Sequence, residues 1–413
     1  MQERERGPVI VSVGGGKGGV GKSVVAVNLA CAFAEKGIRT VLADADLGGA
    51  NVHTFFGISR PEKTLRSFLA REVSSLDEAL IPSGFDNLSL LCGATALLDA
   101  ANPHYAKKER LLKGLKSLDT DFLVVDIGAG ASLNNLDFFN ASHRGLIVTA
   151  PQPTSIQNAY GFLKLALQRR VMRLVGMERL KRIFPDQSPE SLKGMEFTAF
   201  LSKIEESDEE AGDLVRYDLE VLKVYLVVNM ATPAEARKVY STIDAVANRF
   251  LTVSLSFLGH IPPSRDVEVS VRKMRPVLSG GGGEVGERVR EMARTLLGDL
   301  SPRRDDLTPP SRLDFFQGLP EEERKKARLV LNDDVHHNGF RIHVQTEDLG
   351  PEKAEVVTVV FSGGQVLFSR KSSYSDLGVE GGGPDEVRER ALWQHRGVLA
   401  GISRGKLDDK IAR

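Results

Sequence analysis

Hydrophobic and polar residues follow two alternating patterns over the first 300 positions. Buried strands are predicted by short, mostly apolar runs at residues 9–13, 40–43, 122–126, 145–150 and 224–230. Helices are predicted between them, as in residues 23–36, where Val24 and Val27 repeat at helical spacing and Gly37 ends the pattern. Strands that alternate with helices predict an α/β fold with a doubly wound, mainly parallel sheet.

The pattern changes near residue 300. Residues 301–310 are rich in proline and charge, which is typical of a linker. Beyond it the sequence predicts a short helix, one half-buried strand, a hairpin and a last helix, at residues 321–331, 340–345, 356–369 and 384–405. We therefore expect a first domain over residues 1–300, a linker with a short helix over 301–335, and a small α+β module over 336–413. The module carries no evident chemistry, so partner docking is expected by elimination.

The first domain contains more chain than its alternation needs. Connections between strands and helices usually take about 2 to 6 residues, so the segment between Ser155 and Asn229 implies a helical insertion, at about residues 168–222. Residues 164–182 hold seven Lys and Arg against one Glu, whereas residues 205–213 hold six Asp and Glu. Either opposite charges of a helical pair face each other or water, or the basic run forms a surface for anionic lipid or DNA phosphate.

Composition narrows the class of protein. The chain has 413 residues, 55 of them basic and 55 acidic, so no net charge draws it to nucleic acid or membrane. Its two cysteines, Cys31 and Cys92, form no CxxC pair, which favours a reduced, cytosolic protein without disulfides or thiolate metal sites. The charged N-terminus leads into a strand, and no apolar run approaches about 18 residues, so neither a signal peptide nor a transmembrane helix is expected.

Candidate chemistry begins with a glycine-rich loop between the first strand and the first helix. Residues 16–23 match G-x-x-x-x-G-K-[ST], and glycines let backbone N–H groups at a helix N-terminus approach a polyphosphate. Lys22 is expected to reach the β- and γ-phosphates, and the Ser23 hydroxyl to ligate Mg²⁺. The nucleotide-binding residues predicted here are Gly16, Lys17, Gly18, Gly19, Val20, Gly21, Lys22 and Ser23.

A second lysine, Lys17, stands too early in the loop to share the role of Lys22. The sequence Gly-Lys-Gly-Gly-Val-Gly-Lys-Ser resembles the deviant Walker A signature of the MinD/ParA class of P-loop ATPases, nearest to the branch of FlhG and MinD. This resemblance implies that Lys17 crosses a dimer interface to the phosphates of the partner's ATP, in a nucleotide-sandwich homodimer. The alternative is that Lys17 is a solvated charge on the loop.

Carboxylates follow two of the predicted strands, where α/β folds place their chemistry. Asp44 and Asp46 come after residues 40–43, and Asp126 ends the run 122–126. The resemblance implies that Asp46 orients the attacking water, that Asp44 lies near the metal, and that Asp126 is the Walker B aspartate that holds Mg²⁺. Asp44 and Asp46 could instead cap their loop. Ile127 departs from the small residue usual after the Walker B aspartate in this class.

Three further segments carry the resemblance. Pro-Gln-Pro-Thr-Ser at residues 151–155 is similar to Pro-Glu-Pro-Thr-Ser in MinD and FlhG, although Thr154 or Ser155 could simply cap a helix. Asn229 and Met230 end a strand, and Pro262 lies in a segment like the base-enclosing loop of the class, so these three residues are expected at the adenine. The helix expected over residues 284–297 is interpreted as a closing core element, not as a membrane anchor.

The sequence therefore predicts an ATPase that uses ATP and Mg²⁺ and hydrolyses slowly, gated by dimerisation. Its expected role is to position a flagellum, a division site or a polar assembly, with a protein partner that stimulates hydrolysis or docks on the C-terminal module. We expect it in the cytoplasm and peripherally on the inner face of the plasma membrane. Alternatives are a ParA-like partition ATPase on non-specific DNA and an Mrp-type iron–sulfur carrier, which would need a cysteine pair.

Overall fold

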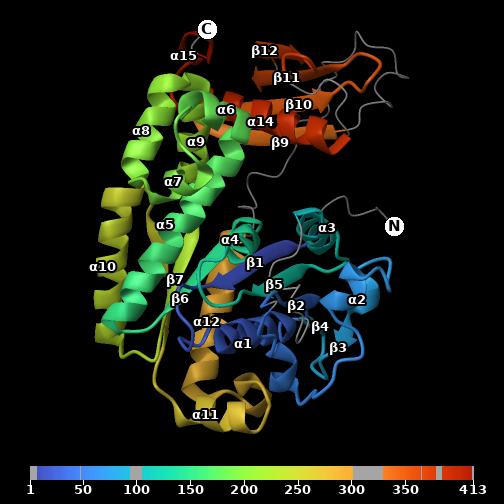
Figure 1. The fold of residues 1–413 in the computed structure, drawn as a ribbon, viewed down its shortest axis with the longest axis vertical. Coiled ribbons are helices and arrows are strands. Elements are labelled where there is room, and N and C mark those ends of the chain that lie inside the picture. The colour runs from blue at the N-terminus through green and yellow to red at the C-terminus, as the bar shows by residue number, and fades with distance from the viewer. Residues whose placement is uncertain are drawn as a thin grey trace. The chain divides into compact units, whose positions relative to one another are not determined.

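The computed structural model describes residues 7–46, 48–93, 105–300, 329–363, 365–377 and 384–411. The chain divides into two compact units, each built from two stretches of sequence. The first comprises Met1–Arg170 with Lys223–Pro302, and the second comprises Val171–Leu222 with Arg303–Arg413. Figure 1 shows the elements of both.

The first unit is built on an eight-stranded sheet of order β3-β4-β2-β5-β1-β6-β7-β8. Every neighbouring pair is parallel except β3 with β4. The strands are β1 (Val9–Gly14), β2 (Thr40–Asp44), β3 (Ile81–Pro82), β4 (Leu88–Leu91), β5 (Phe122–Asp126), β6 (Arg144–Thr149), β7 (Val224–Asn229) and β8 (Leu255–Ile261). The predicted doubly wound sheet is confirmed, with β1 between the two directions of winding.

Helices cover both faces of this sheet. The helices that begin in the first unit are α1 (Lys22–Ala34), α2 (Leu65–Leu69), α3 (Tyr105–Lys116), α4 (Leu133–Asn140), α5 (Pro153–Val175), α10 (Pro233–Leu251), α11 (Arg265–Arg272) and α12 (Gly283–Leu300), with short 3-10 turns at Val52–Phe56, Asp77–Ala79 and Val277–Gly280. On one face Val11 and Val13 join a core with α1 and α12. On the other, the Ser12 hydroxyl donates to the carbonyl of Phe138 in α4 (3.1 Å). The buried face of α12 confirms it as a core element.

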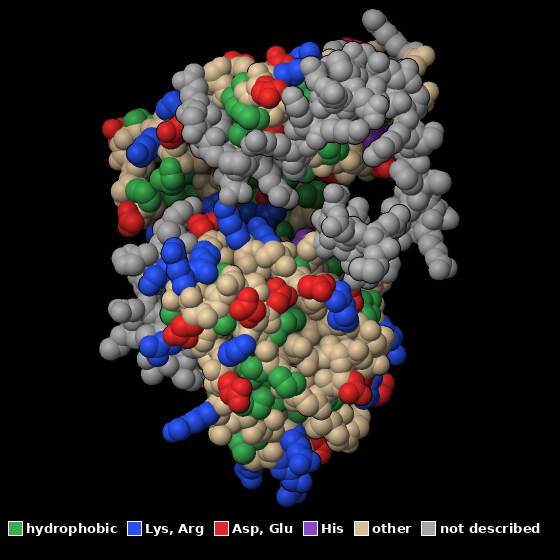
Figure 2. All heavy atoms as spheres, turned by 90° about the vertical axis from the view of Figure 1, so that its right-hand side faces the viewer, with side chains coloured by type: hydrophobic (Ala, Val, Ile, Leu, Met, Phe, Trp, Pro, Cys, Tyr) green, Lys and Arg blue, Asp and Glu red, His purple; other side chains and the backbone are tan. Residues whose placement is uncertain are grey.

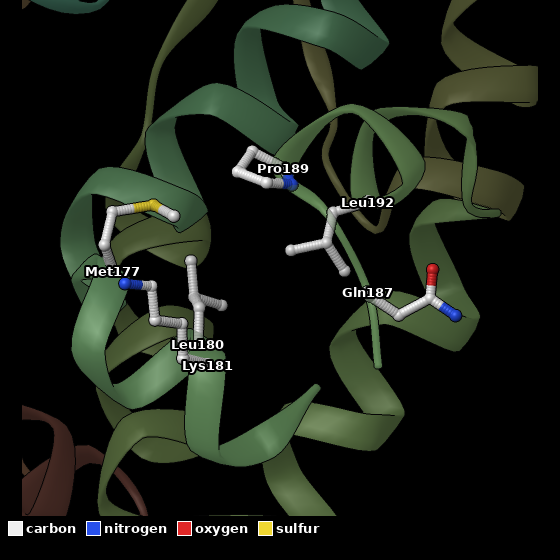
Figure 3. Close-up of a pocket in the computed structure, with 6 residues that line it drawn as sticks. All are labelled: Met177, Leu180, Lys181, Gln187, Pro189 and Leu192. Atoms are coloured by element: carbon white, nitrogen blue, oxygen red, sulfur yellow. The ribbon is translucent and has the colours of Figure 1, made fainter. Parts of the chain in front are cut away.

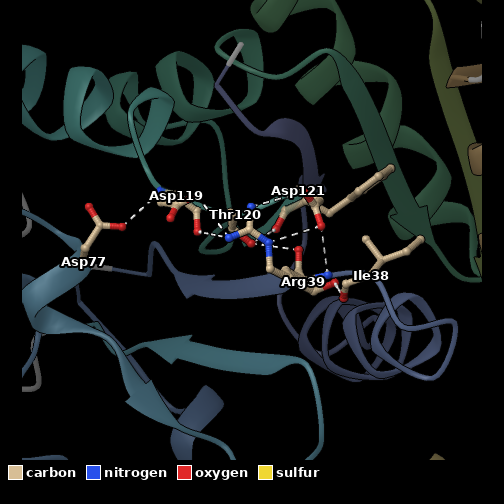
Figure 4. A network of polar contacts seen from close by, with 8 residues as sticks. Ile38, Arg39, Asp77, Asp119, Thr120 and Asp121 are labelled. Carbon is tan, nitrogen blue, oxygen red and sulfur yellow. Dashed lines mark hydrogen bonds and ion pairs between the residues drawn. The ribbon is translucent and has the colours of Figure 1, made fainter. Parts of the chain in front are cut away.

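A polar network ties the amino ends of β2 and β5 together (Figure 4). The Arg39 guanidinium binds the carboxylates of Asp119 (3.1 Å) and Asp121 (3.3 Å). The Thr120 hydroxyl donates to the Arg39 carbonyl (2.8 Å), and the Asp119 amide donates to Asp77 Oδ1 (3.0 Å). This network fixes the strand ends opposite the phosphate loop, so we assign it a structural role.

The second unit contains a four-stranded antiparallel sheet of order β12-β11-β10-β9. Its strands are β9 (Leu329–His337), β10 (Phe340–Asp348), β11 (Glu355–Ser362) and β12 (Gln365–Ser373), and its helices are α6 (Met177–Ile183), α7 (Pro189–Gly194), α8 (Phe197–Ser207), α9 (Glu209–Val221), α14 (Pro384–Ser403) and α15 (Asp408–Ile411). The predicted hairpin is confirmed by the pairing of Ser362 with Gln365. The helix expected over residues 321–331 was wrong at 329–331, which pair with β10; residues 321–328 lie outside the described residues.

The insertion belongs to this second unit because α9 packs against α14 and contributes Tyr217 to the core of the C-terminal sheet. Acidic residues of α9 pair with basic residues of the C-terminal segment. The pairs are Lys406–Glu209 (2.8 Å), Arg370–Glu210 (3.0 Å), Arg396–Asp218 (3.5 Å) and Arg404–Asp213. The sequence-based division placed this insertion with the ATPase domain, whereas its contacts group it with the module.

The two charged runs of the insertion also meet at Arg179. Arg179 of α6 lies 3.4 Å from the carboxylate of Asp208 and 3.3 Å from that of Glu210. Its guanidinium stands 4.3 Å from the centre of the Trp393 ring of α14. The expected pairing of opposite charges therefore holds at Arg179, while Glu209, Glu210 and Asp213 of the acidic run pair with basic residues of the module.

Two surface features carry no chemistry of the predicted kind. Figure 3 shows a small hollow in the insertion, lined by Met177, Leu180, Lys181, Gln187, Pro189 and Leu192. Lys and Arg side chains lie among Asp and Glu side chains over the face drawn in Figure 2, in keeping with the balanced composition. Among the described residues, every helix is too short or too polar to cross a bilayer.

Candidate nucleotide-binding site

The glycine-rich loop connects β1 to α1, and its backbone is possible only with glycine at critical points. Gly21 precedes α1 with φ +89°, the left-handed region that residues with a side chain rarely adopt. A Cβ on Gly16 would lie 2.0 Å from the carbonyl oxygen of Asn158 in the first turns of α5. The loop is thus pressed between α1 and α5, with its amides at the N-terminus of α1.

Lys22 lies inside this loop. Its side chain is 8% exposed, and its Nζ donates to the carbonyl of Lys17 (3.2 Å). Burial lowers the pKa of Lys22, while the carboxylates of Asp126 and Asp46 act in the opposite direction. The structure thus brings the cation of the loop together with two of the predicted carboxylates.

Lys17 has a different environment. Its exposed Nζ donates to the hydroxyl of Thr154 at the start of α5 (2.9 Å). The neighbouring Ser155 is buried, and its hydroxyl contacts Gln152 Oε1 (3.3 Å). The two lysines of one loop therefore turn to different partners, Lys22 into the loop and Lys17 away from it.

Asp126 ends β5 and is almost fully buried. Burial raises the pKa of Asp126 to about 8, nearby Asp44 adds to the rise, and a hydrogen bond from Ser23 opposes it. Within the described part of the chain its Oδ1 has no hydrogen-bond partner. An orphaned carboxylate oxygen beside a serine hydroxyl suits a hard cation, so this pair fits the predicted Mg²⁺ ligands.

Both carboxylate oxygens of Asp44 accept hydrogen bonds from backbone N–H groups. Its Oδ1 accepts the amide of Asp46 (3.1 Å), and its Oδ2 accepts the amides of Asn51 (2.8 Å) and Val52 (2.9 Å). Burial raises the pKa of Asp44 to about 6 despite these bonds. Both oxygens serve the backbone of the segment after β2, which favours the capping alternative; a metal role for Asp44 stays a prediction.

Asp46 stands beside the loop that follows β5. Its Oδ1 accepts the amides of Gly48 (3.3 Å) and Gly49 (3.0 Å). A Cβ on Gly128 would lie 3.0 Å from the Asp46 carboxyl carbon, so backbone and carboxylate are in close contact. Asp46 is therefore held within reach of the Lys22 and Asp126 cluster.

The three residues predicted at the adenine lie at the ends of β7 and β8. These strands pair Asn229 with Ile261, which brings Met230 and Pro262 to one edge of the sheet. The Asn229 Nδ2 donates to the carbonyl of Val20 (2.9 Å), so this amide supports the phosphate loop. The second N–H of this amide and its oxygen are left for the adenine edge, and an adenine role for Asn229 stays a prediction.

Comparisons with known proteins agree with this geometry. A family model described as "ParA: NUBPL iron-transfer P-loop NTPase" matches residues 8–178. The antiactivator FleN of Pseudomonas aeruginosa is 30% identical over 270 residues, which cover 65% of this chain and 78% of FleN. The chain belongs to the MinD/ParA family of P-loop NTPases.

Other MinD/ParA proteins match either over a shorter stretch or with lower sequence identity. The flagellum site-determining protein YlxH of Helicobacter pylori is 34% identical over 164 residues, which cover 38% of this chain and about half (52%) of YlxH. The structure of the septum site-determining protein MinD from Pyrococcus horikoshii, complexed with Mg-ADP, has 19% identity and a TM-score of 0.48, covering 72% of this chain and 99% of that one.

The description of the matched family names iron transfer, and the iron–sulfur alternative considered from the sequence would need accessible thiolates. Both cysteines of this MinD/ParA-family chain are buried. Burial raises the pKa of the Cys92 thiol to about 12 and that of Cys31 still further. Among the described residues no group of three or more His, Cys, Asp or Glu is placed to hold a metal. These thiols are therefore core side chains.

Two polar residues of α4 were missed from the sequence. Asn135 donates to carbonyls of the loop after β5. Asp137, whose side chain is fully buried, binds Arg169 of α5 through two hydrogen bonds (2.9 and 3.1 Å) and also Lys108. The position of Asp137 between Leu136 and Phe138 could have indicated a buried carboxylate that needs a basic partner. Arg169, assigned to the basic run, is thus engaged inside the first unit.

Proposed function

We propose that this chain is a Mg²⁺-dependent ATPase that cycles between a monomer and an ATP-sandwich homodimer to position a cell structure. The observation that carries the proposal is the divergence of the two loop lysines. Lys22 is enclosed by its own loop, whereas Lys17 is exposed and turned outward to Thr154. A lysine that points away from its own phosphate site is available to a second nucleotide.

The residues divide the work of phosphoryl transfer, which depends on positioning and charge neutralisation. Lys22 and the loop amides hold the phosphates. Ser23 and Asp126 would hold Mg²⁺, which supplies positive charge to the β- and γ-phosphate oxygens. Asp46 orients the attacking water, and Lys17 of the partner subunit stabilises charge in the transition state. Hydrolysis is slow because one subunit lacks that last group.

The names of the relatives support a role in spatial regulation. They are an antiactivator, a flagellum site-determining protein and septum site-determining proteins. We propose that the structure positioned is a flagellum or a division site, and that the protein acts in the cytoplasm and peripherally on the plasma membrane. We also propose that residues 1–300 outside the insertion form the ATPase, and that the C-terminal module docks the partner that stimulates hydrolysis.

The test compares Lys17→Ala with Asp46→Ala by light scattering after size exclusion, with ATP and Mg²⁺. Asp46→Ala should accumulate as an ATP-bound dimer because hydrolysis no longer releases it. Lys17→Ala should stay monomeric, and Lys36→Ala, which removes an exposed lysine outside the loop, should behave like the wild type. Identical profiles for the first two variants would refute the assignment.

The DNA and lipid alternatives both need a free basic surface. Arg169 and Arg179 are engaged in ion pairs, which leaves Lys181 and Arg182 among the exposed basic residues of the run. Replacing Lys181 and Arg182 by Glu is therefore the cleaner test. ATP-dependent retention on DNA that this change abolishes would favour the partition alternative; loss of binding to anionic vesicles would favour a membrane surface.

A further inference from the structure

Asn135 in the first turn of α4 gathers three successive backbone carbonyls. Its Nδ2 lies 3.1 Å from the oxygen of Gly128, 3.1 Å from that of Ala129 and 2.9 Å from that of Gly130. The side chain is buried, so these carbonyls share one donor group away from solvent. The reversed amide would set a carbonyl oxygen against three others, so the orientation is determined by electrostatics.

The residue is also fixed from its backbone. The backbone N–H of Asn135 donates to the hydroxyl of Ser132, the N-cap residue of α4 (3.2 Å). Asn135 therefore holds residues 128–130 from one side while the helix cap holds Asn135. Gly130 has φ +84°, a conformation that glycine adopts readily, so the chain can turn here toward Asn135.

Residues 128–130 form a wall between two parts of the site. Gly128 touches the carboxylate of Asp46, as its hypothetical Cβ contact of 3.0 Å shows. Ala129 faces the phosphate loop, since a Cβ on Gly18 would lie 3.8 Å from the Ala129 methyl group. A shift of this wall would move the surface against which Asp46 rests.

We propose that Asn135 is a positioning residue for hydrolysis, which it serves by fixing the wall that backs Asp46. The inference rests on the proposed ATPase function, in which Asp46 orients the attacking water. The hydrogen bonds of Asn135 within the described part of the chain go to Ser132 and to residues 128–130, outside the set predicted to bind phosphate or Mg²⁺. Its loss should therefore slow the chemical step and leave nucleotide binding almost unchanged, because displacing a catalytic group by about 1 Å can cost about 100-fold in rate.

The experiment measures kcat, KM for ATP and thermal unfolding for Asn135→Asp and Asn135→Ala in the full chain. Asn135→Asp keeps the shape and turns a carboxylate toward the three carbonyls, whereas Asn135→Ala only removes the donor. Asn140→Asp is the matched control, since Asn140 lies on the same helix and donates to a carbonyl of α5, that of Ala166 (2.9 Å). Hydrogen exchange of amides 128–132 reports the wall directly.

We expect kcat to fall at least about tenfold in both Asn135 variants, with KM within about twofold of wild type and faster exchange at 128–132. Asn140→Asp should leave kcat and that exchange near wild type. The proposal is overturned if kcat of Asn135→Asp matches that of Asn140→Asp. It is also overturned if the fall in kcat of the Asn135 variants is matched by an equal rise in KM for ATP, or by a fall in thermal stability large enough to account for it. A wild type without ATPase activity, or an Asp46→Ala variant with full activity, would instead refute the proposed function, and the inference with it.

Discussion

Replacing Arg179 by Met should loosen the second unit at a point where the insertion meets the C-terminal segment. Arg179 lies in α6, its two carboxylate partners flank the start of α9, and Trp393 belongs to α14. Methionine keeps much of the apolar stem but removes the charge. The change therefore addresses the ion pairs and the cation–π contact together.

The magnitude follows from what stays in place. A partly buried cation–π contact contributes about 1 kcal/mol, and ion pairs with a quarter to a third of each side chain exposed contribute about 0.5 kcal/mol each. Neither acid is left unpartnered, because Asp208 still accepts the amide of Ala211 (3.0 Å) and Glu210 still pairs with Arg370 (3.0 Å). The expected loss is therefore about 2 kcal/mol, below the 3–5 kcal/mol typical of an orphaned buried charge.

The assay is urea unfolding followed by tryptophan fluorescence, since Trp393 is the single tryptophan of the chain and reports on the second unit. With a slope of about 2 kcal/mol/M, the midpoint should fall by about 1 M. Arg182→Met, an exposed change on the same helix, is the control. A midpoint for Arg179→Met equal to that of Arg182→Met would show that the insertion and the module are not held together as described.

Two further predictions concern the buried cluster in the first unit. Arg169→Met should cost about 3 kcal/mol in unfolding free energy, because the buried Asp137 carboxylate loses both hydrogen bonds from the Arg169 guanidinium; circular dichroism in urea measures it, and Lys164→Met on the same helix should cost less than about 0.5 kcal/mol. Burial alone raises the pKa of Asp137, but its bonds from Arg169 and Lys108 outweigh burial and hold that pKa below the ordinary 3.8. The stabilisation is therefore present above pH 3.8 and lost as pH falls through the lower folded pKa, so the stability gap to Asp137→Asn should narrow in acid.

Much of the first unit could be predicted because local patterns and tertiary roles coincide there. The apolar run at residues 122–126 is a strand buried on both faces, and it pairs with β1 on one side and β2 on the other. The conformation of the phosphate loop is equally local at Gly21, whose φ of +89° agrees with the glycine that the motif requires there. Element boundaries agree within a few residues, as for β6 and α12.

Contacts that depend on the path of the folded chain escaped prediction. Asn135 reads as an ordinary helix residue, and only the turn of the chain after β5 brings three carbonyls to its amide. Strand β9 is nearly as polar as a loop, and its pairing with β10 rather than its composition makes it a strand. The acidic residues of α9 predict basic partners, but no local pattern indicates that Arg404 pairs with Asp213.

A unit assembled from two separated stretches has a consequence for biosynthesis. Lys406 follows its partner Glu209 by 197 positions, and ribosomes add about 5–20 residues per second, so the acidic side of α9 waits roughly 10–40 s for its counter-charges. Until synthesis passes Ser373, the end of β12, the nascent second unit lacks a complete sheet to pack against. Ribosome stalling between the two stretches would therefore release chains that have a complete phosphate loop but an incomplete second unit. The apolar surface left exposed on that unit is what quality-control proteases recognise.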